Sequence, residues 1–192
     1  DSIVIKSSGV NTKFFKPEKR KKNNEYIILF PARIIKEKGI NELLIACKSL
    51  WSKGYKFKLY IAGNIDTGNR SSLSKKELTN LKKNPNIKCL GHLKNIKKIY
   101  NLSDLVILPS WREGLSRTLL EASSMEKAII TTNVPGCRDV ITHNENGLLI
   151  KLKDPKDIEK SILFLYKNRK IASSFGKEAR VRVINNFDIN II

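Results

Sequence analysis

The feature that most constrains the fold is a regular alternation of short apolar runs with longer amphipathic stretches. Six runs rich in Ile, Val and Leu are typical of strands: 26–30, 56–62, 87–90, 105–108, 128–131 and 148–150. Apolar residues at helical spacing predict helices at 40–53, 74–83, 96–101, 115–125, 138–141, 155–167 and 171–183. Strict alternation predicts an α/β fold, a Rossmann-like doubly wound parallel sheet. Such sheets bind ligands at the carboxyl ends of their strands, so the loops after Phe30, Ala62, Leu90, Leu108 and Thr131 are the candidates for a site.

The chain is strongly basic, with 37 Lys and Arg against 18 Asp and Glu, a formal net charge of +19. Such a charge suits nucleic acid, an anionic membrane surface or a phosphorylated substrate. The simpler explanation is a lysine-rich composition that scatters cations over solvated faces. The densest cluster, residues 16–24, is predicted to be a flexible loop between two structured stretches. No aromatic residues interleave with a basic stripe, so stacking on single-stranded nucleic acid is not supported.

Length and cysteine content exclude several classes of protein. A chain of 192 residues suits one domain, and its apolar runs are far shorter than the ~20 residues of a membrane-spanning helix. Three widely spaced cysteines, no Cys-x-x-Cys pair and two histidines predict neither a disulfide framework nor a zinc site. We therefore expect a reducing compartment and no metal.

The loop after Phe30 carries two cations, Arg33 and Lys38, on either side of a turn that leads into a helix. A guanidinium can bind two oxygens at once and an ammonium supplies a compact charge, so the pair suits a diphosphate. In so basic a chain, the alternative is that both cations are simply solvated.

The loop after Leu108 combines a glycine with two glutamates. Gly114 allows close approach of the backbone to a ligand, and the free N–H groups of the following helix attract an anion. Glu113 and Glu121 would lie ~12 Å apart if all the residues between them were helical. That separation is too wide for the ~5–9.5 Å of a glycosidase carboxylate pair, but suits the two ends of one extended ligand. The alternative is a glutamate favoured by the helix dipole and another on a wet face.

Other loop residues give weaker signals. The Pro135–Gly136 pair predicts a tight turn, and Cys137 has no neighbour that would activate it as a nucleophile. A lone histidine after a strand, as His92 is, is usually structural. No dinucleotide glycine motif, phosphate-binding P-loop or serine nucleophile elbow is present in the sequence.

Together these loops resemble the family 4 retaining glycosyltransferases, specifically the carboxy-terminal, donor-binding half of their GT-B fold. The matching stretches follow the family order over almost the whole chain. They are Ser8–Asn11 with Phe15–Pro17, Ala32–Arg33 with Glu37–Gly39, Ile61–Gly63, Leu90–His92, Asp104 with Leu108–Ser110, Glu113–Gly114 through Glu121–Ala122, Pro135–Asp139 and Asn146–Leu149.

The resemblance implies a role for each matching residue. Arg33 and Lys38 would hold the donor diphosphate, Glu113 would contact hydroxyls of the transferred sugar, and Glu121 would contact the nucleotide ribose. The backbone N–H groups of Gly114 and Leu115 would face phosphate or sugar. The base pocket would lie at Leu90, Gly91 and His92, with Gly63 and Asn64 on the same cleft rim.

The chain departs from the family pattern in three respects. Ala32 replaces a glycine that often precedes the diphosphate arginine, and 123–127 lacks the glycine that family members carry before Lys127. Neither change removes a ligand side chain. The amino-terminal acceptor domain of the family is also absent from this chain. The resemblance divides the chain into an interdomain link with the basic loop, 1–24, and a nucleotide-sugar-binding domain, 25–192, and suggests a part of a longer enzyme.

The expected function is therefore the donor-binding domain of a retaining, hexosyltransferase-type enzyme of surface polysaccharide biosynthesis. The donor would be a nucleoside-diphosphate sugar, with UDP as the favoured nucleotide, and no cofactor would be needed. The acceptor would be a glycan or lipid-linked glycan bound through the missing domain, in the cytoplasm or at the inner face of the membrane. The alternatives are a sucrose or glycogen synthase-like transferase and a non-catalytic nucleotide-sugar or nucleic-acid binding module, although specific nucleic-acid binding is not expected.

Overall fold

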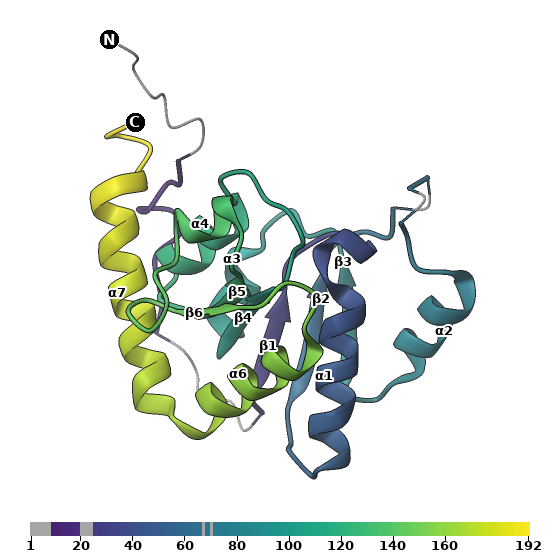
Figure 1. Cartoon of the computed structure of the whole chain (residues 1–192). Coiled ribbons are helices and arrows are strands. Elements are labelled where there is room, and N and C mark those ends of the chain that lie inside the picture. Colours follow the sequence, from purple (N-terminus) through teal and green to yellow (C-terminus); the bar gives the residue numbers. More distant parts are fainter. Residues whose placement is uncertain (1–8, 20–24, 67, 70) are drawn as a thin grey trace.

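The computed structural model describes residues 9–19, 25–66, 68–69 and 71–192. Six parallel strands form one sheet in the order β3-β2-β1-β4-β5-β6 (Figure 1). The strands are β1 (Ile27–Phe30), β2 (Lys58–Ala62), β3 (Ile87–Gly91), β4 (Leu105–Leu108), β5 (Ala128–Thr132) and β6 (Leu148–Ile150). The predicted doubly wound parallel sheet is confirmed, and each predicted strand is found within two residues of its expected ends.

Helices connect every pair of consecutive strands and cover both faces of the sheet. They are η1 (Lys36–Lys38), α1 (Ile40–Ser52), α2 (Lys75–Lys83), α3 (Lys97–Leu102), α4 (Arg117–Ser124), α5 (Pro135–Arg138), α6 (Pro155–Lys167) and α7 (Arg169–Phe187). The predicted capping box at the start of α2 is present: Ser74 accepts from the backbone N–H of Glu77, and the Glu77 carboxylate accepts from the backbone N–H of Ser74.

Three helices have boundaries that differ from the prediction. α4 begins at Arg117 rather than at Leu115, because Ser116 has extended backbone angles and forms its N-cap. α5 spans Pro135–Arg138 rather than 138–141, so the Pro-Gly pair opens a helix instead of making a tight turn. Proline suits the first helical position because its fixed φ is helical and its missing N–H is not needed there. α7 is longer than predicted at both ends.

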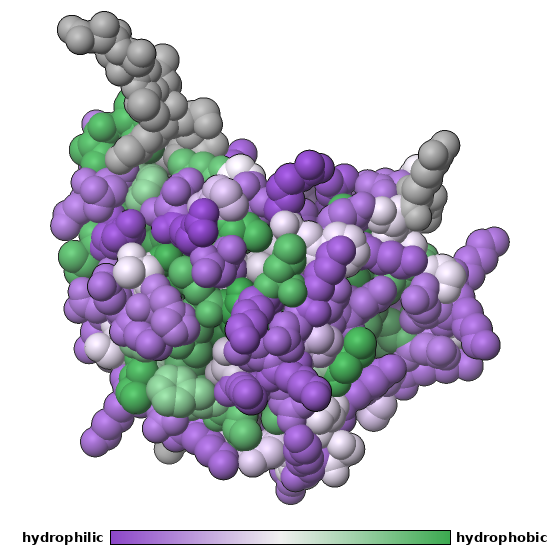
Figure 2. All heavy atoms as spheres, in the orientation of Figure 1, coloured by the Kyte–Doolittle hydropathy of each residue, from purple (hydrophilic) through white to green (hydrophobic). Residues whose placement is uncertain are grey.

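Successive side chains of a strand point to opposite faces of the sheet and pack into two hydrophobic cores. Ile28 and Phe30 of β1 join one core with apolar residues of α1, α2 and α6. Leu29 between them points the other way and joins the second core with α3, α4 and α7. In Figure 1, α1 and α6 lie in front of the sheet, and the space-filling view of the same side in Figure 2 is mostly hydrophilic. None of the helices that the structure describes is both long and apolar enough to cross a membrane.

The two ends of the described chain meet beside α7. The N–H of Val10 donates to the carbonyl of Phe187 over 2.9 Å, and the carboxylate of Asp188 accepts from the hydroxyl and the N–H of Thr12. The hydrogen bond from the Thr12 hydroxyl above all, and then that from the backbone N–H of Asn190, lower the pKa of Asp188 to about 2. The first and last stretches of the fold are therefore joined on one side (Figure 1). The predicted basic loop lies largely in residues 20–24, outside the described residues.

Glu126 occupies the position at which the resembled family carries glycine. Its φ is +54°, in the left-handed region that costs a residue with a Cβ roughly 1–2 kcal/mol. α7 packs directly on this turn, since a Cβ added to Gly176 would lie 2.2 Å from the carbonyl oxygen of Glu126. The side chain of Glu126 lies 3.7 Å from the Arg180 guanidinium, which offsets part of the backbone cost. The departure from the family pattern therefore places a side chain in a left-handed turn that packs against the middle of α7.

Candidate functional site

The candidate site lies at the point where the strand order reverses. β1 and β4 are neighbours in the sheet, but the chain leaves them toward opposite edges, and open α/β sheets bind ligands at such a reversal. The region between the loops that follow β1 and β4 is called the crevice below. Gly39 and Pro109 hold the two loops together: Gly39 has a φ of +75°, and a Cβ there would lie 2.0 Å from the carbonyl oxygen of Pro109. The carbonyl of Glu37 accepts from the Trp111 N–H over 2.8 Å and from the Ser110 hydroxyl over 3.1 Å.

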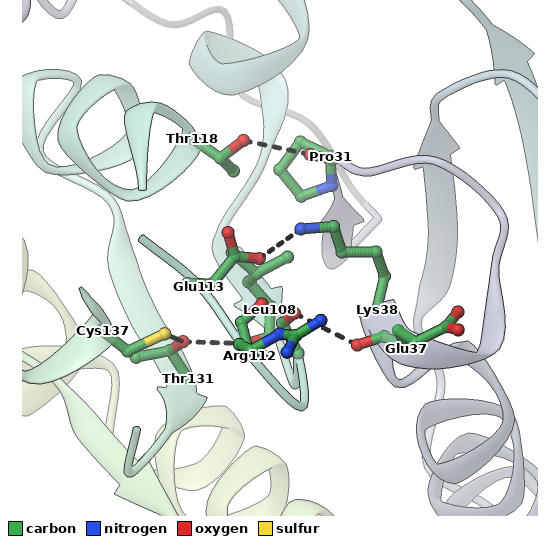
Figure 3. A network of polar contacts seen from close by, with 10 residues as sticks. Pro31, Glu37, Lys38, Leu108, Arg112, Glu113, Thr118, Thr131 and Cys137 are labelled. Atoms are coloured by element: carbon green, nitrogen blue, oxygen red, sulfur yellow. Dashed lines mark hydrogen bonds and ion pairs between the residues drawn. The ribbon is translucent and has the colours of Figure 1, made fainter. Parts of the chain in front are cut away.

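These loops place Lys38 and Glu113 against one another. Figure 3 shows the two side chains pointing toward each other from η1 and from the loop after β4. Lys38 Nζ lies 2.6 Å from Glu113 Oε1, and the side chains are 22% and 12% exposed. The sequence predicted a role for each residue separately and did not predict their pairing. Glu113 thus neutralises the ammonium that the family resemblance assigns to the diphosphate.

Arg33 lies farther out than Lys38 does. Its side chain is 58% exposed, and its guanidinium Nη1 lies 2.7 Å from Asp66 Oδ2, in the loop after β2. An exposed ion pair of this kind contributes little to stability. A ligand phosphate can therefore replace Asp66 as the partner of the Arg33 guanidinium at a small cost in free energy. Asp66 was not predicted, because nothing in the sequence shows that its loop lies beside Arg33.

Gly63 and Asn64 support the loop after β1. A Cβ added to Gly63 would lie 2.0 Å from the carbonyl oxygen of Ala32, so only glycine fits there. The carbonyl of Asn64 accepts from the N–H of Ile34 over 3.0 Å. Both residues were predicted on the cleft rim, and the contacts that the structure gives them are structural ones that position Arg33.

Glu121 lies in α4, half-buried, and its carboxylate accepts from the hydroxyl of Tyr100 over 3.2 Å. Burial raises the pKa of Glu121, and the Tyr100 hydroxyl and the Arg117 guanidinium lower it in part. Since α4 begins only at Arg117, Glu113 lies outside the helix and the ~12 Å separation expected for a continuous helix does not apply. Tyr100 was not predicted as a site residue, since no local pattern links it to a glutamate of another helix.

The amino end of α4 follows the loop that carries Glu113. The side chain of Ser116 makes no capping hydrogen bond, and the first turn of α4 contains no acidic residue. Unpaired N–H groups at a helix start attract an anion. Gly114 and Leu115 precede this turn instead of opening the helix as predicted. A Cβ on Gly114 would meet nothing within 4 Å, whereas Gly136 of α5 packs tightly against the carbonyl oxygen of Gly114.

The remaining predicted residues lie at the end of β3. Leu90 and Gly91 are its last two residues, Gly91 has a φ of +65°, and His92 follows with an exposed side chain. Because β3 is parallel to β1 and β4, this loop leaves the same edge of the sheet as the crevice. The structure thus places these residues on the expected edge and gives them no further contact that defines a role.

Two further observations concern chemistry in the crevice. The thiol of Cys137 is buried beside the hydroxyl of Thr131 (Figure 3), and its burial raises its pKa to about 11. The thiol is therefore protonated at neutral pH, as expected for a residue that is not a nucleophile. Among the described residues, no three His, Cys, Asp or Glu side chains are grouped as metal ligands.

Comparison with known proteins decides the family. The family described as glycosyl transferases group 1 matches residues 11–182. The chain belongs to this family. It is 34% identical over 170 residues to the capsular polysaccharide biosynthesis glycosyltransferase CapM of Staphylococcus aureus, covering 88% of this chain and 44% of CapM.

A second relative agrees with this result, and a solved structure shares the fold. The chain is 30% identical to the N,N'-diacetylbacillosaminyl-diphospho-undecaprenol alpha-1,3-N-acetylgalactosaminyltransferase of Campylobacter jejuni, with 98% of this chain and 51% of that protein covered. The fold matches Anabaena HepE in complex with UDP and glucose at a TM-score of 0.83 and 17% identity, with 95% of this chain and 52% of HepE covered. The chain thus spans about half the length of these three proteins.

Proposed function

We propose that this group 1 chain is the donor-binding half of a retaining glycosyltransferase that uses a nucleoside-diphosphate sugar, with UDP as the nucleotide. The observation that carries the proposal is the crevice at the β1–β4 reversal, where Lys38 and Glu113 meet. The open amino end of α4 follows Glu113 in the same loop. A cation, a carboxylate and free N–H groups suit a ligand that joins a diphosphate to a polyhydroxylated sugar.

Within this proposal each group has a distinct task. Lys38, Arg33 and the N–H groups at Gly114 and Leu115 neutralise the diphosphate as it leaves, which makes a metal unnecessary. Glu113, released from Lys38 by the phosphate, accepts from sugar hydroxyls. Glu121 accepts from the ribose, and the loop 90–92 receives the base. The proposal is supported by the shared fold of HepE, which was solved with UDP and glucose.

The acceptor is proposed to be a glycan or lipid-linked glycan in the assembly of a cell-surface polysaccharide in the cytoplasm. The name of CapM places that relative in capsular polysaccharide biosynthesis, and the name of the Campylobacter enzyme includes a diphospho-undecaprenol acceptor. Acceptor recognition would require a domain beyond this chain, of the kind that the length of the relatives leaves room for. The chain alone is therefore proposed to bind donor weakly and to transfer nothing.

The test is a calorimetric titration of the chain with UDP and with GDP, followed by an assay of sugar transfer from the nucleotide that binds. Binding of UDP in preference to GDP, with no transfer, is the expected result. A preference for GDP would change the proposed nucleotide. Sugar transfer by this chain alone would contradict the proposal that transfer requires a further domain. Binding of neither nucleotide by a folded sample would favour a non-catalytic module.

We also infer peripheral contact with an anionic membrane face, through the segment before β1. Phe14 is 49% exposed, and the ammonium of Lys97 lies 5.5 Å from the centre of its ring. Lys13, Lys16 and Lys19 flank it and are exposed. An exposed aromatic ring among lysines suits the boundary between anionic headgroups and acyl chains.

Co-sedimentation with vesicles tests this contact. Replacing Lys13, Lys16 and Lys19 by Gln is expected to weaken binding to vesicles containing phosphatidylglycerol by on the order of 100-fold, at about 1 kcal/mol per cation. The matched control replaces Lys75, Lys76 and Lys83 of α2, which removes the same charge from another surface. Equal losses in both variants would show that net charge alone is responsible, and steeper salt dependence with duplex DNA than with vesicles would favour nucleic acid.

A further inference from the structure

Glu121, the glutamate that we assign to the ribose, is held from behind by a buried tyrosine. Tyr100 lies in α3 and is fully buried in the core shared by α3, α4 and α7. Its hydroxyl lies 3.2 Å from Glu121 Oε2 and 3.3 Å from the carbonyl oxygen of Thr118, so its proton is shared between two acceptors of α4. This contact fixes one oxygen of the carboxylate against the adjacent helix.

The other carboxylate oxygen is left available. Glu121 Oε1 has no protein partner in the part of the chain that the structure describes. An ionised carboxylate offers lone pairs to several donors, so Oε1 can accept from a ligand hydroxyl while Oε2 stays fixed. A side chain that is already held loses less rotamer freedom when a ligand binds.

We propose that Tyr100 is a positioning residue for nucleotide binding, whose hydroxyl holds the Glu121 carboxylate with Oε1 left for the ribose hydroxyls. This inference rests on the proposed function of the crevice. Packing in the core does not by itself require such a hydrogen bond. Tyr26 is also buried, at 7% exposure, and its hydroxyl has no hydrogen-bond partner among the described residues.

The protonation of Glu121 gives this role a measurable consequence. Burial raises the pKa of Glu121, while the hydrogen bond from Tyr100 of α3 and the charge of Arg117 of α4 lower it. The ionised form is the one that accepts from both Tyr100 and a ribose hydroxyl. Ligand binding is therefore strongest above the pKa of Glu121 and weakens as the pH falls through it. Removing the Tyr100 hydroxyl removes one influence that lowers the pKa, so this weakening would begin at a higher pH.

The experiment compares Tyr100→Phe with Tyr26→Phe in this same chain. UDP affinity is measured by calorimetry across a pH series, and the carboxyl carbon of Glu121 is titrated by NMR. Because the phosphate of UDP also titrates, the variants are compared at equal pH. Tyr100→Phe is expected to weaken UDP binding on the order of 5- to 10-fold, the effect of losing one hydrogen bond. It is also expected to raise the pH below which UDP binding weakens. Tyr26→Phe is expected to change neither, and circular dichroism confirms that both variants are folded.

The outcomes separate this inference from the proposed function. If Tyr100→Phe binds UDP as the unchanged chain does at every pH, the positioning role is wrong. If the unchanged chain binds no UDP, the proposed function fails instead. The NMR titration then shows whether the Tyr100 hydroxyl holds the Glu121 carboxylate. An unaltered titration of Glu121 in Tyr100→Phe would overturn the inference, and an upward shift absent from Tyr26→Phe would support it.

Discussion

Gly39→Ala is expected to destabilise the chain by about 3 kcal/mol and to abolish measurable nucleotide binding. Two costs add at this residue: the left-handed φ of +75°, at about 1 kcal/mol or more, and overlap with the carbonyl oxygen of Pro109 at 2.0 Å. Relief of this overlap must separate the loops after β1 and β4. Because the crevice is formed by those loops, the same change displaces Lys38 from Glu113. Urea unfolding and UDP titration measure the two effects.

Gly54→Ala is the matched control for this prediction. Gly54 also has a left-handed φ, +86°, but a Cβ there would meet nothing within 4 Å. The control is expected to cost only about 1 kcal/mol and to leave UDP affinity unchanged. Equal destabilisation by the two changes would mean that close approach of the two loops contributes nothing, and the account of how the crevice is held would then be wrong.

Lys38→Ala is expected to weaken UDP binding by roughly 10- to 100-fold, the loss of one charge-assisted hydrogen bond to phosphate. It also leaves Glu113, 12% exposed, without its cation, so the chain is expected to lose about 1–3 kcal/mol of stability. Lys36→Ala is the control, because Lys36 lies in the same turn η1 and has no ion pair to the described residues.

A double variant separates the two consequences of losing Lys38. Lys38→Ala with Glu113→Gln removes the unpaired charge, so most of the lost stability is expected to return while UDP binding stays weak. If UDP affinity returned together with stability, Lys38 would act only as the partner of Glu113. The assignment of Lys38 to the diphosphate would then be withdrawn.

The strands and the order of elements were predictable because they depend on local pattern. Short apolar runs such as 105–108 indicate strands buried in the interior of a sheet. Their alternation with helices makes a parallel sheet the simplest arrangement. The ends of helices were less predictable, because they depend on single residues. The N-cap of α4 at Ser116 and the start of α5 at Pro135 are set by the backbone angles of single residues.

The site was predictable as a set of loops and not as a set of contacts. Lys38 and Glu113 are far apart in sequence, and only the register of β1 against β4 brings them to 2.6 Å. The same holds for Arg33 with Asp66 and for Tyr100 with Glu121. The sequence shows that residue 39 is a glycine, but it does not show that this glycine packs against Pro109 of another loop.

NMR mapping of the nitrogen-15-labelled chain with UDP shows where the nucleotide binds. We expect shifts of backbone signals concentrated at residues 33–39 and 113–121, at the carboxyl ends of β1 and β4. A cavity of about 630 Å³ at the opposite end of the strands, lined by Tyr26, Asp104 and Arg169 among others, provides the competing location. Shifts confined to that cavity, with the crevice unperturbed, would contradict the account.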